Sequence, residues 1–472
     1  MLFTVDIGTS SLKTALWDYD GNRHFFASAP LPMNIIENFK YETECAKWLR
    51  AFEDCCAEIS KKNPKNISNV EAIVISGNGP SLVPVLEEPE IKNGKLSLEA
   101  ANALLWLDRR AVKYQAEVSE VMGGFVDAGF FLPKIQYLKN EEKGLYKKVK
   151  YFLGCPEYLS YALTGEAKTV FPCEGFDRWF WNDSVLEKLK LDKKKFPGFI
   201  RPGDPFGMLI PSAADNFGFK KNIPVISGGP DFFASILGAG VTEPAQACDR
   251  TGSSEGINLC TRMQVSDKRL MSYGHPVKPY WNLSGIINTT GKAVEWCRNL
   301  LGISSFEDFF ALAKMSKPGS SGLIFNPYLA GERAPFWDPS IRAHWRGISL
   351  SSGRSEFANS VLEGIGFAVK DVITAMEETG EKTAQLRVTG SMAGNACLNQ
   401  IKADITGLEI LEGKYREGEL LGLAVIGSCF LGRYSSFAQA CSAMVHVENK
   451  YEPDLKNAEL YKELFFEYRK NC

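Results

Sequence analysis

The sequence predicts an α/β fold, because strand-like and helix-like segments alternate along the chain. Several of the strand-like segments run directly into glycine-rich turns. Ligands of open α/β sheets gather outside such strand ends. The chain has 472 residues, too many for one ordinary core, so we expect two large domains.

The chain begins with two expected strands, residues 2–5 and 12–17, joined by the small-residue turn 8–11. A turn of Gly, Thr and Ser places backbone N–H groups and hydroxyls close together, which suits phosphate oxygens. Asp6 lies where a carboxylate could hold a metal-bound water beside those phosphates. An ordinary hairpin turn uses the same residue types, so this alternative stays open. The segment is not a Walker A loop, because the residue before Lys13 is not glycine.

Three further strands are expected where apolar runs precede glycine-rich turns. They comprise residues 70–76, 223–227 and 386–389. The second of them leads into Asp231 and a helix of small residues, 232–238. We therefore expect the candidate ligand-binding residues to lie at the strand ends of the sheets.

A weak internal repeat supports the expectation of two domains. Residues 6–11 are echoed by residues 249–254, and each copy continues into an apolar segment. Two such turns, one in each half, would face a phosphate chain from opposite sides. We place the boundary after residue 243, which gives an N-terminal domain, 1–243, and a C-terminal domain, 244–472, joined through a hinge.

Charge and composition argue against several classes of protein. The net charge of −2 supplies no basic field that would recruit nucleic acid or an anionic membrane. The longest apolar stretch, residues 420–431, is too short to span a bilayer. The first residues lack the basic region of a signal peptide. We expect a cytoplasmic protein with a small-molecule partner rather than nucleic acid or membrane.

The cysteines and histidines do not form a recognisable metal or nucleophile pattern. Twelve cysteines occur without a C-x-x-C spacing, and the chain has only four histidines. A zinc site or a Cys/His nucleophile is therefore not expected. Free thiols in this number favour a reducing compartment.

Asp231 is the candidate catalytic residue. It ends a Gly-Gly-Pro turn after an expected buried strand and opens a helix. Transfer of phosphate to an alcohol needs a group that accepts the hydroxyl proton, and a carboxylate at a rigid strand-to-helix corner suits that task. The alternative is a helix N-cap, a position that Asp fills well.

A candidate sugar-binding cluster follows from Trp106, Asp108 and Arg109, which lie within four positions. An indole face packs against sugar C–H groups, while a carboxylate and a guanidinium bind hydroxyls. Asn78, followed by Gly79 in a Gly-Asn-Gly turn, is a second candidate. The alternatives are a solvated helix start for the first segment and simple turn chemistry for the second.

Two glycine-rich helix starts, at Gly291 and Gly390, are candidates for binding a flat purine. Asn395 offers an amide for the edge of the base or for its ribose. Such turns are common, so each signal is weak. The polar and aromatic segment 328–338 is interpreted as a structural loop that contains a buried ion pair.

Taken in order, these segments resemble the FGGY carbohydrate kinases, the family of xylulokinase, gluconokinase and glycerol kinase. The resemblance extends from about residue 2 to about residue 432. The matching segments are residues 6–11, 75–79, 106–110, 133–134, 228–231, 251–254, 328–335 and 390–395.

The resemblance implies two domains with ribonuclease-H-like cores, of the actin and hexokinase superfamily, with nucleotide and sugar meeting in a cleft between them. It implies transfer of the γ-phosphate of ATP to a sugar or polyol hydroxyl, with Mg²⁺. Asp231 matches the catalytic base of the family, and Asp6 matches the acid near the metal.

The resemblance also implies the remaining site residues. The phosphate loops match at Gly8, Thr9, Ser10 and Lys13, and at Thr251 and Gly252. The adenosine-side positions are Gly291, Glu295, Gly390, Ser391 and Asn395. The sugar-side positions are Asn78, Gly79, Trp106, Asp108, Arg109, Asp231 and Phe232.

This chain departs from the family pattern at several positions. Many ketose kinases have Gln-Met-His-Gly where this chain continues from Asn78, and many have Asn or Gln where it has Phe232. Position 295 is often Gln in glycerol kinases and is Glu295 here, and the usual triple glycine is reduced at residues 390–392. These changes affect the sugar pocket and the nucleotide contacts, while the phosphate turn and the base are kept.

We expect a ketose acceptor such as a xylulose-like pentulose. A polyol, an aldonate and a deoxy-sugar stay open as acceptors, as does a catalytically idle sugar or nucleotide sensor. Which sugar and which hydroxyl react, the oligomeric state and any effector are not determined by the sequence. The amphipathic segment 451–472 would either cap the C-terminal domain or form a homodimer contact.

Overall fold

The computed structural model describes residues 1–32, 34–37, 40–62 and 67–470. The chain divides into two compact units, which are described separately below. Unit 1 comprises residues 1–234 and 419–444, and unit 2 comprises residues 235–418 and 445–472. The boundary expected after residue 243 stays a prediction. Residues 419–444 belong to unit 1, although they come after most of unit 2 in the sequence.

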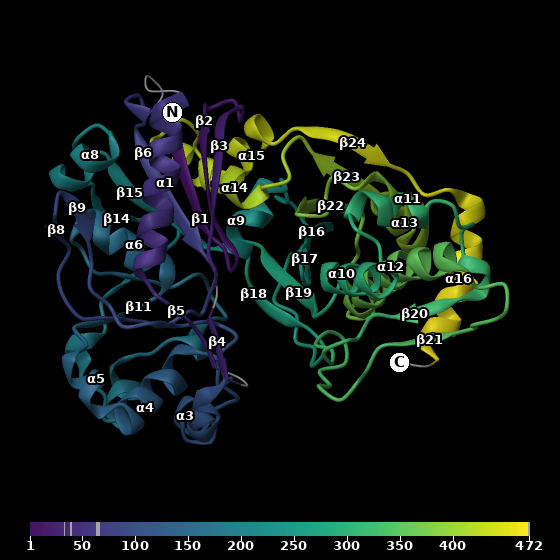
Figure 1. Cartoon of the computed structure of the whole chain (residues 1–472), viewed down its shortest axis with the longest axis horizontal. Helices are drawn as coiled ribbons and strands as arrows, with labels where there is room; N and C mark the ends of the chain where they lie inside the picture. Colours follow the sequence, from purple (N-terminus) through teal and green to yellow (C-terminus); the bar gives the residue numbers. More distant parts are fainter. Residues whose placement is uncertain (33, 38–39, 63–66, 471–472) are drawn as a thin grey trace. The chain divides into compact units, whose positions relative to one another are not determined.

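Unit 1 is built on a six-stranded sheet with the strand order β14-β15-β6-β1-β2-β3 (Figure 1). The strands are β1 Leu2–Ile7, β2 Ser11–Trp17, β3 Arg23–Pro30, β6 Ala72–Gly77, β14 Pro205–Met208 and β15 Pro224–Pro230. The larger helices are α1 Ala46–Lys62, α3 Gln115–Met122, α4 Phe131–Glu141, α6 Cys155–Thr164 and α14 Gly418–Phe430. The smaller helices are α5 Lys143–Lys148, α7 Asp183–Lys188, α8 Pro211–Phe217 and α15 Phe437–Met444. Helix α9, Asp231–Gly238, begins in this unit.

The two central strands of this sheet are covered on both faces. Every residue of β1 and β6 is buried, as expected for strands of a parallel pair with helices on each side. On one face, the ring of Phe3 makes an edge contact with Phe52 of α1 at 6.0 Å. On the other face, α14 lies so close that a Cβ on Gly427 would come within 2.8 Å of the side chains of Leu2 and Val74. The segment 419–444 therefore completes the core of unit 1.

Unit 2 contains a seven-stranded sheet with the order β18-β19-β17-β16-β22-β23-β24. The strands are β16 Gln246–Thr251, β17 Glu255–Thr261, β18 Met271–Gly274, β19 Trp281–Ile287, β22 Gln385–Gly390, β23 Glu409–Gly413 and β24 Val447–Tyr451. The helices are α10 Gly291–Leu300, α11 Phe306–Ala313, α12 Arg354–Glu377, α13 Ala396–Thr406 and α16 Leu455–Arg469. The expected C-terminal amphipathic helix is thus α16, and residues 471–472 lie outside the described part of the chain.

The short strands form small two- and three-stranded sheets beside these two. They are β4 Asn34–Glu37, β5 Lys40–Thr43, β7 Val83–Val85, β8 Glu90–Lys92, β9 Lys95–Ser97, β10 Ala103–Leu104, β11 Tyr151–Leu153, β12 Thr169–Val170, β13 Phe199–Ile200, β20 Ile324–Asn326 and β21 His344–Arg346.

The two large sheets share one topology. In each, an antiparallel hairpin (β1–β2 or β16–β17) is extended by a third antiparallel strand on one side and by parallel strands on the other. This repetition agrees with the two halves expected from the sequence repeat. It also places a tight turn at the same end of the sheet in both units.

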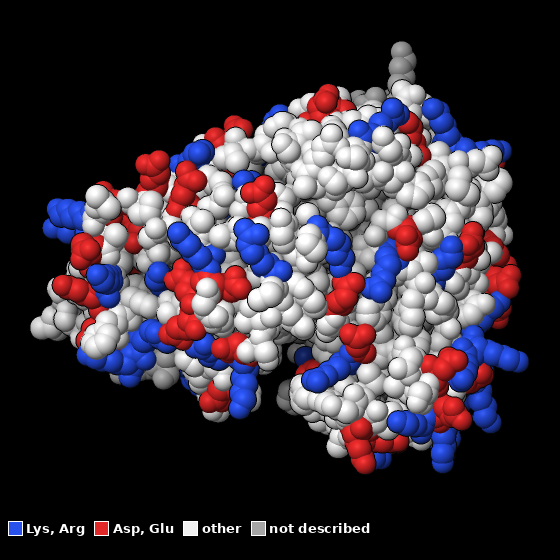
Figure 2. Space-filling model, turned by 180° about the vertical axis from the view of Figure 1, so that it is seen from behind, with Lys and Arg blue, Asp and Glu red and all other residues white. Residues whose placement is uncertain are grey.

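Two surface properties bear on function. On the face shown in Figure 2, Lys and Arg side chains are interspersed among Asp and Glu side chains. Within the described residues, no helix is both long enough and apolar enough to cross a membrane.

Candidate active site

Three candidate residues of unit 1 lie at the carboxyl ends of neighbouring parallel strands. Asp6 is near the end of β1 and pairs in register with Ser76 of β6. Asn78 directly follows β6, and Asp231 directly follows β15, whose Pro230 pairs with Gly77. The strand order therefore brings Asp6, Asn78 and Asp231 to one edge of the sheet.

Cys155, the first residue of α6, provides independent evidence for this grouping. Its thiol donates a hydrogen bond to the Asn78 carbonyl oxygen at 3.0 Å. Burial raises the pKa of the Cys155 thiol well above its usual value, and the negative charges of Glu157, Asp6 and Asp231 raise it further. Cys155 thus lies against Gly77 and Asn78 at this edge of the sheet.

The first phosphate turn has the tight geometry expected from its composition. The Gly8 amide donates to the Ser11 carbonyl at 3.0 Å, and a Cβ on Gly8 would lie only 2.9 Å from that oxygen. Thr9 accepts a hydrogen bond on its hydroxyl from the indole N–H of Trp106, at 3.2 Å. The turn is therefore tied to the candidate sugar-binding segment, and Ser10 is exposed beside it.

Lys13 lies opposite Asp6 in the β1–β2 ladder. Its ammonium group forms an ion pair with the carboxylate of Glu419 at 2.6 Å, near the start of α14. This contact connects the phosphate-turn hairpin to the late segment of the chain. The phosphate contact expected for Lys13 stays a prediction.

Asp231 is the first residue of α9 and is partly exposed. Its carboxylate accepts a hydrogen bond from the Phe232 amide at 2.7 Å. Asp231 therefore lies at the strand-to-helix corner expected from the sequence, and its roles as helix N-cap and as general base both stay predictions.

The Asn78 side chain is buried and holds its own turn. Its amide nitrogen donates to the Ile7 carbonyl at 2.9 Å, and its amide oxygen accepts from the Ser81 hydroxyl at 2.7 Å. No atom lies within 4 Å of a Cβ built on Gly79, so the space there does not require glycine. A contact of Asn78 or Gly79 with sugar stays a prediction.

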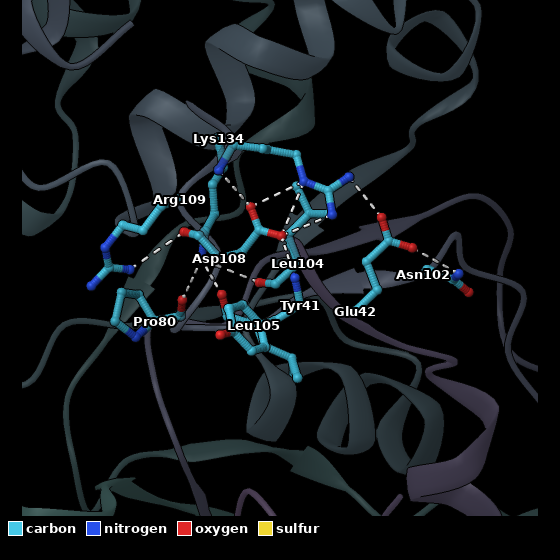
Figure 3. A network of polar contacts seen from close by, with 10 residues as sticks. Tyr41, Glu42, Pro80, Asn102, Leu104, Leu105, Asp108, Arg109 and Lys134 are labelled. Carbon is cyan, nitrogen blue, oxygen red and sulfur yellow. Dashed lines mark hydrogen bonds and ion pairs between the residues drawn. The ribbon is translucent and has the colours of Figure 1, made fainter. Parts of the chain in front are cut away.

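Asp108 lies in the interior of unit 1, with 0% of its side chain exposed (Figure 3). Its carboxylate accepts from the guanidinium of Arg110, at 2.8 to 3.0 Å, and from the Tyr41 amide at 2.8 Å. Arg110 also forms an ion pair with Glu42 at 2.6 Å. Asp108 therefore positions its own segment, and a direct contact with sugar stays a prediction.

Arg109 points away from this cluster. Its Nη1 donates to the Trp106 carbonyl at 2.7 Å, and its Nε faces a carboxylate oxygen of Asp127 at 3.3 Å. These contacts fix Arg109 next to Trp106, the aromatic residue of the candidate sugar-binding cluster.

The sequence pattern gave no function to Lys134, which is central to this region (Figure 3). Its fully buried ammonium donates to the carbonyl oxygens of Pro80, Leu104 and Leu105, at 3.1, 3.2 and 2.7 Å. Burial lowers its pKa to about 7. Lys134 thus joins the loop that carries Asn78 to the segment before Trp106, two loops far apart in the sequence.

We expect Lys134→Met to lower the free energy of unfolding by about 1–3 kcal/mol, because buried carbonyl oxygens lose their donor. The KM for the sugar should rise more than kcat falls, since the two loops lose their link. Urea unfolding and steady-state kinetics check both. Lys139→Met is the matched control, because Lys139 lies on the same helix, is partly exposed and, within the described part of the chain, donates to a single carbonyl, that of Leu189. Equal effects of the two substitutions would contradict the expectation.

In unit 2, the second phosphate turn contacts the start of α10 and the glycine-rich segment after β22. The helix expected to begin at Gly390 begins instead at Ala396, because Gly390 ends β22 and Asn395 is the N-cap of α13. The Gly291 amide donates to the Gly252 carbonyl at 3.0 Å, and the Ser391 amide donates to the Thr251 carbonyl at 3.0 Å. Gly390 has φ +100°, and a Cβ there would lie 2.0 Å from the Thr251 carbonyl oxygen, so only glycine fits. The structure therefore brings together five of the residues expected on the nucleotide side.

Two further residues expected on the nucleotide side lie on the adjoining helices. Asn395 is the N-cap of α13 and accepts from the Leu398 amide at 2.9 Å. Glu295 of α10 is partly exposed and pairs with Lys292 at 2.7 Å. Their expected contacts with adenosine stay predictions.

The loop 328–338 anchors the start of α10 through Asn288. Glu332 accepts from the Asn288 amide at 2.8 Å, and Arg333 donates to the Asn288 side chain at 2.6 Å. Burial raises the pKa of Glu332 to about 7. Glu332 and Arg333 thus both bind Asn288, and the ion pair expected within this loop stays a prediction.

A buried cluster that sequence reasoning did not find supports the second phosphate turn. Lys402 of α13 has 0% of its side chain exposed and pairs with Asp249 of β16 at 2.6 Å. Its ammonium also bonds Glu255, the first residue of β17. Burial raises the pKa of Glu255, and the nearby charge of Asp249 adds to that rise. The cluster therefore fastens both strands that flank the turn to α13.

The cluster also corrects the alignment of the sequence repeat. The repeat matches Asp6 with Asp249, but Asp6 is two positions before the turn glycine, Gly8, and Asp249 is three positions before Gly252. Arg250 is thus the structural equivalent of Asp6. Because alternate residues of a strand face opposite sides of a sheet, Asp249 faces the side opposite to that expected from the repeat.

The donor chemistry of the unit 1 edge fits Mg²⁺. The described residues contain no group of three or more His, Cys, Asp or Glu side chains arranged for a metal ion. Mg²⁺ is commonly held by only one or two carboxylates together with substrate phosphates, so Asp6 beside a phosphate turn is a suitable donor.

Comparison with known proteins identifies the family. Residues 1–238 match the N-terminal domain model of the FGGY family of carbohydrate kinases, and residues 251–430 match its C-terminal domain model. A xylulose kinase of Lactococcus lactis subsp. lactis is 28% identical, over 98% of this chain and 94% of its own length. A gluconokinase of Bacillus subtilis is 24% identical, over 98% and 93% of the two chains.

Solved structures agree with this result at the level of the fold. A gluconate kinase from Lactobacillus acidophilus superposes with a TM-score of 0.85 at 22% identity, covering 99% of this chain and 96% of that one. The Plasmodium falciparum glycerol kinase with ADP gives 0.83 at 19% identity, covering 100% and 98%. These matches confirm the predicted α/β class. The chain belongs to the FGGY family of carbohydrate kinases and is a phosphotransferase that acts on an alcohol group.

Proposed function

We propose that this kinase transfers the γ-phosphate of ATP to a hydroxyl of a ketose of pentulose size, with Asp231 as general base. The observation that carries the proposal is the position of Asp231 at the start of α9, on the same sheet edge as Asp6 and Asn78. The names of the relatives support the acceptor, since several of them are xylulose kinases.

In this proposal the reaction is a direct transfer. The acceptor oxygen forms a bond to the γ-phosphorus while the bond from that phosphorus to the leaving oxygen of ADP breaks. The Asp231 carboxylate accepts the proton of the hydroxyl.

The two hydroxyl-rich turns would hold the phosphates. Backbone N–H groups and hydroxyls of residues 8–10 in unit 1, with Lys13, and of Thr251 and Gly252 in unit 2 supply the donors. Asp6 would hold Mg²⁺, which neutralises negative charge on the phosphates when it is bound. Residues on the adenosine side would be Gly291, Glu295, Gly390, Ser391 and Asn395.

The thiols support a reducing cellular compartment. All eleven cysteines within the described residues are free, and most of them are buried. We propose the cytoplasm as the location on this ground.

A coupled ADP-release assay with ATP and Mg²⁺ tests the proposal. The panel would contain ketoses, aldonates, polyols and deoxy-sugars, with a no-sugar control. We expect one class of acceptor to raise turnover far above the rate without sugar. Turnover that is equal with and without every acceptor would contradict kinase activity on these sugars.

A further inference from the structure

A row of aromatic rings begins at the residue after the proposed base. The ring of Phe232 stacks with Phe176 at a centroid distance of 5.7 Å and an interplanar angle of 10°. Phe176 contacts Trp179 at 4.9 Å, and Trp179 stacks on Phe130 at 4.1 Å. Phe130, Trp179 and Phe232 are partly exposed, whereas Phe176 is buried. Three of the four rings are therefore accessible to a ligand, and the buried ring of Phe176 holds the row in place.

The row continues into the candidate sugar-binding segment. Gly129 precedes Phe130 in the chain, and a Cβ on Gly129 would lie 2.1 Å from Nη1 of Arg109. The same Nη1 donates to the Trp106 carbonyl, and the Trp106 indole donates to Thr9. The aromatic row is thus joined by direct contacts to the first phosphate turn.

These contacts close into a ring within unit 1. From Thr9 the path returns along the sheet edge, because the Asn78 amide donates to the Ile7 carbonyl at the end of β1. The neighbouring register pair, Gly77 with Pro230, leads back to Asp231. The proposed base, the first phosphate turn and the aromatic row are therefore consecutive parts of one ring of contacts.

The polar residues in this ring of contacts, Asn78 and Arg109, already make several hydrogen bonds within the protein. The side-chain oxygen of Asn78 accepts from the Ser81 hydroxyl, and its side-chain nitrogen donates to the Ile7 carbonyl. Arg109 uses Nη1 for backbone carbonyls and sets Nε against Asp127. On the aromatic side, the indole N–H of Trp179 is the one polar side-chain group that the row itself carries. A hydroxyl held against this side would lose its hydrogen bonds to water, which is unfavourable, whereas a methyl or methylene group would gain by burial.

We propose that the acceptor is a deoxy ketose, whose carbon without a hydroxyl packs against the row formed by Phe232, Phe176, Trp179 and Phe130. This inference rests on the proposed function and narrows its substrate class. It also accounts for the apolar residue after the proposed base, where an amide would offer hydrogen bonds to a hydroxylated sugar.

The test uses pairs of ketoses that differ by one hydroxyl. Suitable pairs are pentuloses with their 1-deoxy counterparts and hexuloses with their 6-deoxy counterparts. We expect kcat/KM to favour a deoxy member by about 10–100-fold, the discrimination that an apolar pocket achieves for one such group. Calorimetry without ATP should show the same order of affinities, which separates recognition from chemistry.

Two substitutions at one position localise the preference. Phe232→Asn introduces an amide, and we expect it to reduce the deoxy preference by about tenfold. Phe232→Leu keeps the site apolar and should retain the preference. Circular dichroism checks that both variants are folded, and the comparison of wild-type pairs does not depend on either variant.

The outcomes distinguish this inference from the proposed function. Good turnover with the fully hydroxylated member preferred in every pair would overturn the inference and leave the kinase proposal intact. Preferential binding of a deoxy member without any turnover would support the inference and count against the proposed reaction. If Phe232→Asn leaves the ratio of kcat/KM for the deoxy and hydroxylated ketoses unchanged, the aromatic row does not cause the preference.

Discussion

Asp231→Asn is expected to lower kcat by about 10²–10⁴-fold, because an amide cannot accept the proton of the acceptor hydroxyl. The substitution preserves the shape of the side chain and an oxygen that can accept from the Phe232 amide. The fold should therefore survive, and the KM values should change less than kcat.

The measurement is the rate of ADP release with the best acceptor, together with the thermal midpoint of unfolding. Asp215→Asn is the matched control, since Asp215 is an exposed residue of α8 with 65% of its side chain accessible. The control should leave kcat unchanged. A kcat for Asp231→Asn within tenfold of the wild type would exclude Asp231 as the general base.

Lys402→Met is expected to lower the free energy of unfolding of unit 2 by about 3–5 kcal/mol, because it leaves two buried carboxylates without their cation. Lys402, Asp249 and Glu255 are all fully buried. Because the cluster holds both strands beside the second phosphate turn, the KM for ATP should rise more than the KM for the sugar.

Urea unfolding checks the stability, and a variant that also replaces the two carboxylates checks the cause. Lys402→Met combined with Asp249→Leu and Glu255→Met should recover most of the loss, since well-packed apolar groups commonly replace a buried ion cluster without cost. Lys370→Met on α12 is the control, because among the residues that the structure describes Lys370 donates to one carbonyl, that of Thr406, and faces no carboxylate. If Lys402→Met unfolds at the same urea concentration as Lys370→Met, the cluster does not have the stabilising role assigned to it.

The sequence predicted the elements that have local signals. The strand expected at residues 70–76 is β6, Ala72–Gly77, and the strand expected at residues 223–227 is β15, Pro224–Pro230. Helix starts were expected at Asp231 and Gly291 and are found there. In each case an apolar run followed by glycines within a few residues specifies the local structure, so a single sequence suffices.

The parts that were missed depend on contacts between residues far apart in the chain. Lys402 meets Asp249 across 153 positions, and Lys134 meets Pro80 across 54. A lone lysine on a helix carries no sign of the carboxylate or carbonyl that it will meet. The repeat was misaligned for a related reason, since similar residues matched in the sequence while the strand register placed Asp249 one position away from the equivalent of Asp6.

Helix α14 has a consequence for synthesis on the ribosome. Leu2 and Val74, whose side chains pack against it, are made long before residues 419–444. One face of the first sheet therefore stays uncovered until most of the polypeptide has been translated. A nascent chain that stalls before residue 419 would expose apolar strands of that sheet, and we expect such a chain to need chaperone protection against aggregation.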